Sequence, residues 1–97
     1  MSGPSTGSVQ ATFTGTRIEW YGLKNVDLGK ADVYLDGALS QSGIDAYSPK
    51  RQNALLFTKG GLANGAHTIR IVVTGQKNNA STGAALVHDY FIAYVDL

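Results

Sequence analysis

Aromatic rings and planar polar side chains recur in three separated stretches of this 97-residue sequence. The stretches 21–27, 47–52 and 76–79 carry amide, cationic or carboxylate side chains, and the first two also carry a tyrosine. Sugar recognition needs this combination, because ring faces stack on C–H surfaces while planar polar groups bind hydroxyls. We therefore predict a glycan-binding set made up of Tyr21, Lys24, Asn25, Asp27, Tyr47, Arg51, Gln52 and Asn78.

The same inventory argues against catalysis. Glycoside hydrolysis needs two apposed carboxyl groups, and Glu19 is the only glutamate of the chain. His67 lies in a long apolar strand pattern, which fits a structural hydrogen bond better than a catalytic base. His88 precedes Asp89, but neighbouring residues of a strand point to opposite faces, so these two do not form a dyad. We expect no enzymatic activity.

Charge and composition exclude further classes of function. Eight Lys and Arg residues against seven Asp and Glu residues give a net charge of +1, which leaves no electrostatic footprint for nucleic acid or a membrane surface. The chain has no cysteine, and no apolar run is long enough to span a bilayer. We expect no cofactor. Calcium is the metal that the oxygen ligands of this chain suit best, yet no compact Asp-x-Asp-x-Asp loop is present.

Short strands separated by turns must position the predicted glycan-binding residues. Alternation with a period of two begins at Val9 and predicts about seven strands, the last over 85–95. Asp36-Gly37 is a strong signal for a two-residue hairpin, and the face shared by Asp32, Tyr34 and Asp36 fits a solvated surface. Residues 1–8 fit a flexible lead-in without the features of a signal peptide. We therefore predict one all-β domain over 9–97, an antiparallel β-sandwich.

The order of the strands predicts where the loops lie. If successive strands run up and down, the connections 22–30, 48–52 and 75–84 meet at one end of the sandwich, and the tighter turns meet at the other. We call the three longer connections the rim. Trp20 lies on the same strand face as Ile18 and is predicted in the core. Tyr21 lies on the opposite face and is predicted at the rim.

Five strings carry a resemblance to a known group, namely TFTGTRIEWYG (12–22), GKADVYLDG (29–37), AYSPKRQNALLF (46–57), GLANGAHTIRIVVTG (61–75) and VHDYF (87–91). The chain resembles the galactose-binding-like jelly-roll modules of bacterial secreted glycoside hydrolases and surface proteins. The resemblance covers residues 9–97 and implies a jelly roll that binds carbohydrate without catalysis, in an extracellular setting. The strings are mostly scaffold, so they do not identify a sugar.

The resemblance also bears on assembly. Modules of that group usually carry further strands before the equivalent of Val9, and a jelly roll without them should expose a sheet edge or part of its core. Both faces of the last strand are apolar. One face holds Val87, Phe91, Ala93 and Val95, and the other holds Leu86, Tyr90, Ile92 and Tyr94. We expect a homo-oligomer with Tyr90, Ile92 and Tyr94 at its interface. The alternative to glycan binding is a structural domain that self-associates through this strand and its open sheet edges.

Overall fold

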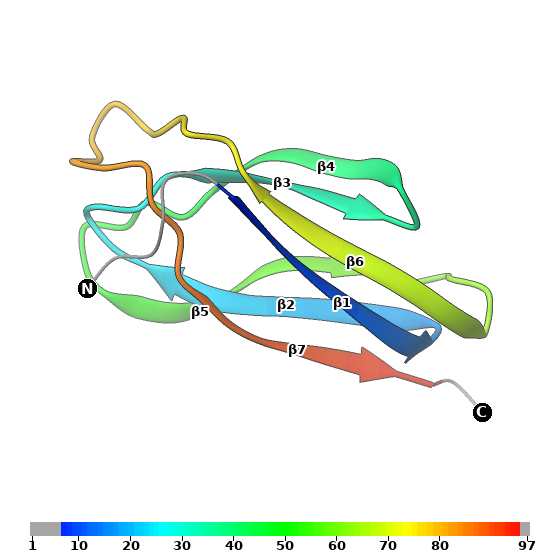
Figure 1. The fold of residues 1–97 in the computed structure, drawn as a ribbon. Coiled ribbons are helices and arrows are strands. Elements are labelled where there is room, and N and C mark those ends of the chain that lie inside the picture. Colours follow the sequence, from blue (N-terminus) through cyan, green and yellow to red (C-terminus); the bar gives the residue numbers. More distant parts are fainter. Residues whose placement is uncertain (1–6, 96–97) are drawn as a thin grey trace.

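The chain folds into two antiparallel β-sheets packed face to face. A computed structural model describes residues 7–95 and contains seven strands, drawn in Figure 1. The bounds of the strands are β1 Gly7–Gly15, β2 Arg17–Lys24, β3 Lys30–Leu35, β4 Ala38–Asp45, β5 Gln52–Lys59, β6 Gly65–Val73 and β7 His88–Tyr94. One sheet has the order β1-β6-β3-β4 and the other β5-β2-β7. The predicted all-β antiparallel sandwich is confirmed, and no helix long and apolar enough to cross a bilayer occurs within residues 7–95.

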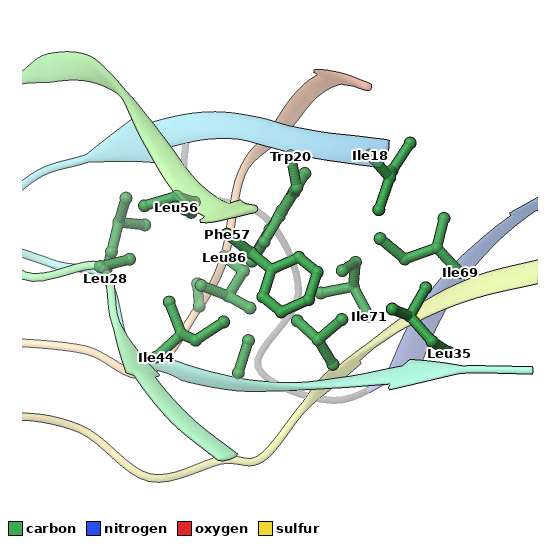
Figure 2. Packing of buried hydrophobic residues seen from close by; sticks show 14 residues of the cluster. Ile18, Trp20, Leu28, Leu35, Ile44, Leu56, Phe57, Ile69, Ile71 and Leu86 are labelled. Carbon is green, nitrogen blue, oxygen red and sulfur yellow. The ribbon is translucent and has the colours of Figure 1, made fainter. Parts of the chain in front are cut away.

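Alternation along the strands builds the core between the sheets. Ile18 and Trp20 face inward from β2, while Ile69 and Ile71 face inward from β6, and each is at most 2% exposed. Figure 2 shows Trp20, Phe57 and Ile71 within the space between the sheets, where they belong to one buried cluster. Burial of such side chains stabilises each by about 1.5–3 kcal/mol. The predicted core position of Trp20 is therefore confirmed.

The connections separate into two ends, as the parity of the strands predicts. Figure 1 shows the β2–β3, β4–β5 and β6–β7 connections together at one end, and the other three connections at the opposite end. In the β3–β4 hairpin, Asp36 and Gly37 have φ values of 51° and 84°, the positive values that a two-residue turn of this kind requires. Each connection except this hairpin passes from one sheet to the other.

Two irregular positions set which side chains face outward. On β5, Leu56 is the extra residue of a bulge opposite Trp20 and Tyr21, and on β7 Asp89 is the extra residue opposite Tyr21 and Gly22. A bulge reverses the facing of the residues beyond it. Leu86 is consequently buried in the core. The prediction that Leu86 shares a face with Tyr90 is therefore wrong, because Asp89 lies between them as the extra residue.

The ends of the ordered region differ from the predicted bounds. Strand β1 begins at Gly7, so Gly7 and Ser8 belong to the sheet, and the rest of the predicted lead-in lies outside the described residues. Where the edge strands β1 and β7 approach each other, Phe13 and Phe91 pack against the core but are only partly buried. Val9 of β1 is 38% exposed.

Candidate functional site

Main-chain hydrogen bonds hold the three connections of the rim together. Ser48 N donates to Asn25 O at 3.1 Å, Lys30 N donates to Gln76 O at 2.9 Å, and Thr82 N donates to Val26 O at 2.9 Å. Within this junction the Ser81 side chain is buried, and its Oγ lies 2.7 Å from Leu28 O. Each connection is therefore tied to another, and the rim is a built platform at one end of the sandwich.

Several predicted rim side chains form hydrogen bonds within this platform. Asn25 Oδ1 accepts a hydrogen bond from Val26 N at 2.8 Å, and Gln52 Nε2 donates to Ser48 Oγ at 3.1 Å. Asn78 Nδ2 donates to Asp45 Oδ2 at 2.8 Å. These three amides stabilise the loops, so fewer of their hydrogen-bonding atoms are left for a ligand.

The other predicted rim residues keep their side chains available. Lys24, Asp27, Tyr47 and Arg51 all lie at this end, and Tyr47 bridges to Asn25 through the main chain. Arg51 is exposed and, within residues 7–95, forms no ion pair with Asp27. The structure thus brings seven of the eight predicted ligand-binding residues to the rim.

Tyr21 is the exception, and its predicted place at the rim is wrong. Strand β2 continues to Lys24, so Tyr21 lies within the strand on the outer face of the three-stranded sheet. Its ring stacks on Tyr90 with centroids 4.8 Å apart and planes 16° apart. Tyr21 therefore lies on the same face as the predicted interface residues. These are Tyr90, Ile92 and Tyr94 of β7, which pair with residues of β2. Tyr90 is 45% exposed and Tyr94 is 37% exposed.

A buried carboxylate organises this aromatic face. Glu19, 6% exposed, accepts hydrogen bonds from Arg17 Nη2 at 2.7 Å, Tyr94 Oη at 2.8 Å and Tyr21 Oη at 3.0 Å. The Arg17 guanidinium and the two hydroxyls lower the pKa of Glu19, while donation to that carboxylate raises the pKa values of Tyr21 and Tyr94. Arg17 also lies 4.3 Å above the Tyr94 ring centroid. The only glutamate of the chain therefore orients two tyrosines.

A hollow lies on the outer face of the other sheet. Its volume is about 620 Å³, and it is lined by Gln10, Tyr34, Asp36, Gly37, Thr68 and Arg70. Strand register explains the grouping, because Arg70 of β6 pairs with Gln10 of β1 on one side and Tyr34 of β3 on the other. An aromatic ring, a guanidinium, an amide, a hydroxyl and a carboxylate thus surround one space, which is the side-chain set that sugar recognition uses.

The sequence alone does not reveal this hollow. Its alternation puts Tyr34 and Asp36 on one strand face, which fits a solvated surface. The missing signal is the pairing of β3 with β6, which sets Tyr34 opposite Arg70 although 36 positions separate them in the chain. Local alternation identifies the outward side of each strand, but it does not say which distant strand lies beside it.

Asp36, which lines the hollow, forms an ion pair with His67. Asp36 Oδ2 lies 2.6 Å from His67 Nδ1, and Asp36 Oδ1 accepts from Thr68 N at 2.9 Å. His67 Nε2 lies 2.6 Å from Ala63 O. Ala63 O and then Asp36 raise the pKa of His67, while His67 and the Thr68 amide lower the pKa of Asp36. The structural role predicted for His67 is confirmed, and both carboxylate oxygens of Asp36 are engaged.

The second histidine contacts the only tryptophan. Trp20 Nε1 donates to His88 Nδ1 at 3.0 Å, so His88 accepts as a neutral ring, and burial lowers its pKa from 6.5. Asp89 instead accepts from Asn53 Nδ2 at 2.7 Å, which agrees with the predicted absence of a dyad.

This contact predicts a pH-dependent optical signal. A histidine whose pKa is lowered by folding contributes stability that is present above its unfolded value and is lost as pH falls through the folded value. We expect Trp20 emission to change on acidification, with a midpoint below 6.5, because protonated His88 cannot accept from the indole. The change should be absent in His88→Gln. A midpoint at or above 6.5 in the native chain would contradict this arrangement.

No metal-binding cluster occurs in the described part of the chain. Within residues 7–95, no three His, Asp or Glu side chains lie close enough together to hold an ion. The predicted absence of a cofactor remains a prediction.

The chain is similar to known proteins both in sequence and in structure. No family model matches the chain. Over 65 residues, 67% of the chain, it is 51% identical to an A type blood N-acetyl-alpha-D-galactosamine deacetylase of Flavonifractor plautii and 42% identical to an A type blood alpha-D-galactosamine galactosaminidase of the same organism. The matches cover 8% and 6% of those proteins, so the chain corresponds to a small part of each.

A Paenibacillus xanthan lyase shares the fold. The structures superimpose with a TM-score of 0.65 over 97% of this chain and 10% of the lyase, at 19% sequence identity. At this identity the likeness establishes the sandwich and nothing about a ligand.

Proposed function

We propose that this domain is a non-catalytic glycan-binding module of a larger carbohydrate-active protein. The observation that carries the proposal is the hollow over Tyr34 and Arg70, where five kinds of sugar-binding group surround about 620 Å³. The relatives support the carbohydrate setting, because both are named for action on amino sugars and each is more than ten times longer than the matched segment. We further propose that the module works outside the cell, where such glycans are exposed.

The hollow is a better site than the three rim amides for a physical reason, although Lys24, Asp27, Tyr47 and Arg51 of the rim are also available to a ligand. Three rim amides already donate or accept within the platform, whereas Gln10, Tyr34 and Arg70 have no side-chain partner within residues 7–95. Polar groups without a protein partner are the ones that can bind a hydroxyl without first breaking a hydrogen bond. The rim remains the alternative site on the same domain.

A binding screen with paired variants tests the proposal. Calorimetry or affinity electrophoresis against a panel of oligosaccharides should show binding by the native domain and its loss in Tyr34→Ala/Arg70→Ala. The matched rim variant Tyr47→Ala/Arg51→Ala should bind as the native domain does. Loss only in the rim variant would move the site to the rim, and binding to no glycan in the panel would contradict the proposal.

Self-association is a second candidate function, and the aromatic face favours it. Tyr90, Tyr94 and Leu55 are 45%, 37% and 44% exposed on the outer face of the three-stranded sheet. Apolar groups gathered on one flat face favour contact between proteins. A homo-oligomer should then form at micromolar concentration and dissociate in Ile92→Lys. A light-scattering mass of 10.2 kDa for the native chain would contradict it.

A further inference from the structure

The charges around the hollow point to the class of glycan it takes. We propose that the hollow selects a sugar that carries a carboxylate, with the Arg70 guanidinium as the group that binds it. This inference rests on the proposed glycan-binding function and adds the substrate class of the same site.

Arg70 has no partner for its charge in the described structure. Its side chain is exposed on β6, and within residues 7–95 it forms no ion pair and no side-chain hydrogen bond. A guanidinium offers planar paired donors that match the two oxygens of a carboxylate. Tyr34, directly opposite in the strand register, supplies the ring against which the sugar would stack.

The carboxylates near the hollow do not compete for Arg70. Asp36 has both oxygens occupied, one by His67 at 2.6 Å and the other by the Thr68 amide at 2.9 Å. Asp32 lies on the same face of β3, and its Oδ1 accepts from Gly43 N at 2.9 Å. His67 also offsets the charge of Asp36, because the pair holds His67 toward its protonated form. The local balance therefore leaves the charge of Arg70 for a ligand.

The geometry also limits what else the hollow favours. A neutral sugar would still stack on Tyr34 and bind Gln10 and Thr68, but it would leave the guanidinium bound only to water. An amino sugar with a protonated amine would face Arg70 with a like charge. The expected order of affinity is therefore a uronic acid first, a neutral or N-acetylated sugar next and an amino sugar last.

A matched pair of polysaccharides tests this order. Affinity electrophoresis or calorimetry should use polygalacturonate and the same polymer after reduction of its carboxyl groups, with galactosamine and N-acetylgalactosamine as monosaccharide probes. The native domain should bind the acidic polymer about tenfold or more tightly than the reduced one. Arg70→Gln should erase that preference and retain binding to the reduced polymer, while Lys59→Gln, which removes an exposed cation on β5 of the other sheet, should change neither.

The outcomes separate this inference from the function on which it rests. Equal affinity for the two polymers, tighter binding of galactosamine, or a preference that survives in Arg70→Gln would overturn the acidic specificity and leave glycan binding standing. Binding to none of these probes or to the wider oligosaccharide panel would overturn both.

Discussion

Replacing Tyr34 by alanine is expected to weaken glycan binding by about tenfold or more. The ring is half-buried on the outer face of β3, opposite Arg70, and it forms the apolar surface of the hollow. Without it the sugar would lose its stacking surface, whereas the polar groups that remain can exchange ligand for water at little cost. Calorimetric titration of the native and variant domains with the best glycan of the screen would measure the change.

Two neighbouring variants show whether the ring itself is responsible. Tyr34→Phe retains the ring and removes only the hydroxyl, so its affinity should stay within a few-fold of the native value. Leu39→Ala changes the residue that pairs with Tyr34 on β4, where Leu39 is 54% exposed, and should leave affinity unchanged. Equal losses in Tyr34→Ala and Leu39→Ala, or none in either, would contradict a stacking role.

Replacing Gly29 by alanine is expected to cause a large loss of stability. A Cβ at this position would lie 2.6 Å from Ala84 Cα, Ala84 O and Gln76 O, all of which are main-chain atoms that cannot move aside alone. The same residue accepts from Ala46 N and donates to Ala85 O, so it lies where the connections of the rim meet. Overpacking of this kind costs about 1–3 kcal/mol, which corresponds to a fall of about 4–8 °C in Tm per kcal/mol.

Gly60→Ala provides the matched control for that variant. Its Cβ would meet only Arg17 side-chain atoms at 3.8 and 3.9 Å, which are ordinary contacts. Gly60→Ala should therefore melt close to the native protein, while Gly29→Ala should melt well below it by circular dichroism. If both variants melt alike, loop 75–84 does not pack closely on Gly29.

The sequence predicts the scaffold well because local physics determines it. Alternation along Ala31, Val33 and Leu35 identifies the inward face of β3, and Asp36-Gly37 specifies the hairpin that follows. Given seven antiparallel strands, parity alone places the three longer connections at one end. Each of these inferences needs only neighbouring residues or the direction of a strand.

The candidate site is less predictable because it depends on pairing between distant strands. Arg70 lies beside Tyr34 only because β3 and β6 are neighbours in the sheet, and Gln10 joins them only because β1 adds to the other side of β6. The misplacement of Tyr21 has a local cause instead, since β2 runs past Gly22 as far as Lys24. The bulge at Asp89, which turns His88 toward Trp20, leaves no clear mark in the sequence.

The most direct test of the glycan site is a map of backbone amide shifts. Titration of the isotopically labelled domain with an acidic oligosaccharide, followed by two-dimensional NMR, reports which residues sense the ligand. We expect the largest shifts to cluster on Gln10, Tyr34, Thr68 and Arg70, across β1, β6 and β3. The largest shifts at Asn25, Tyr47, Arg51 and Asn78, or no saturable shift at all, would contradict it.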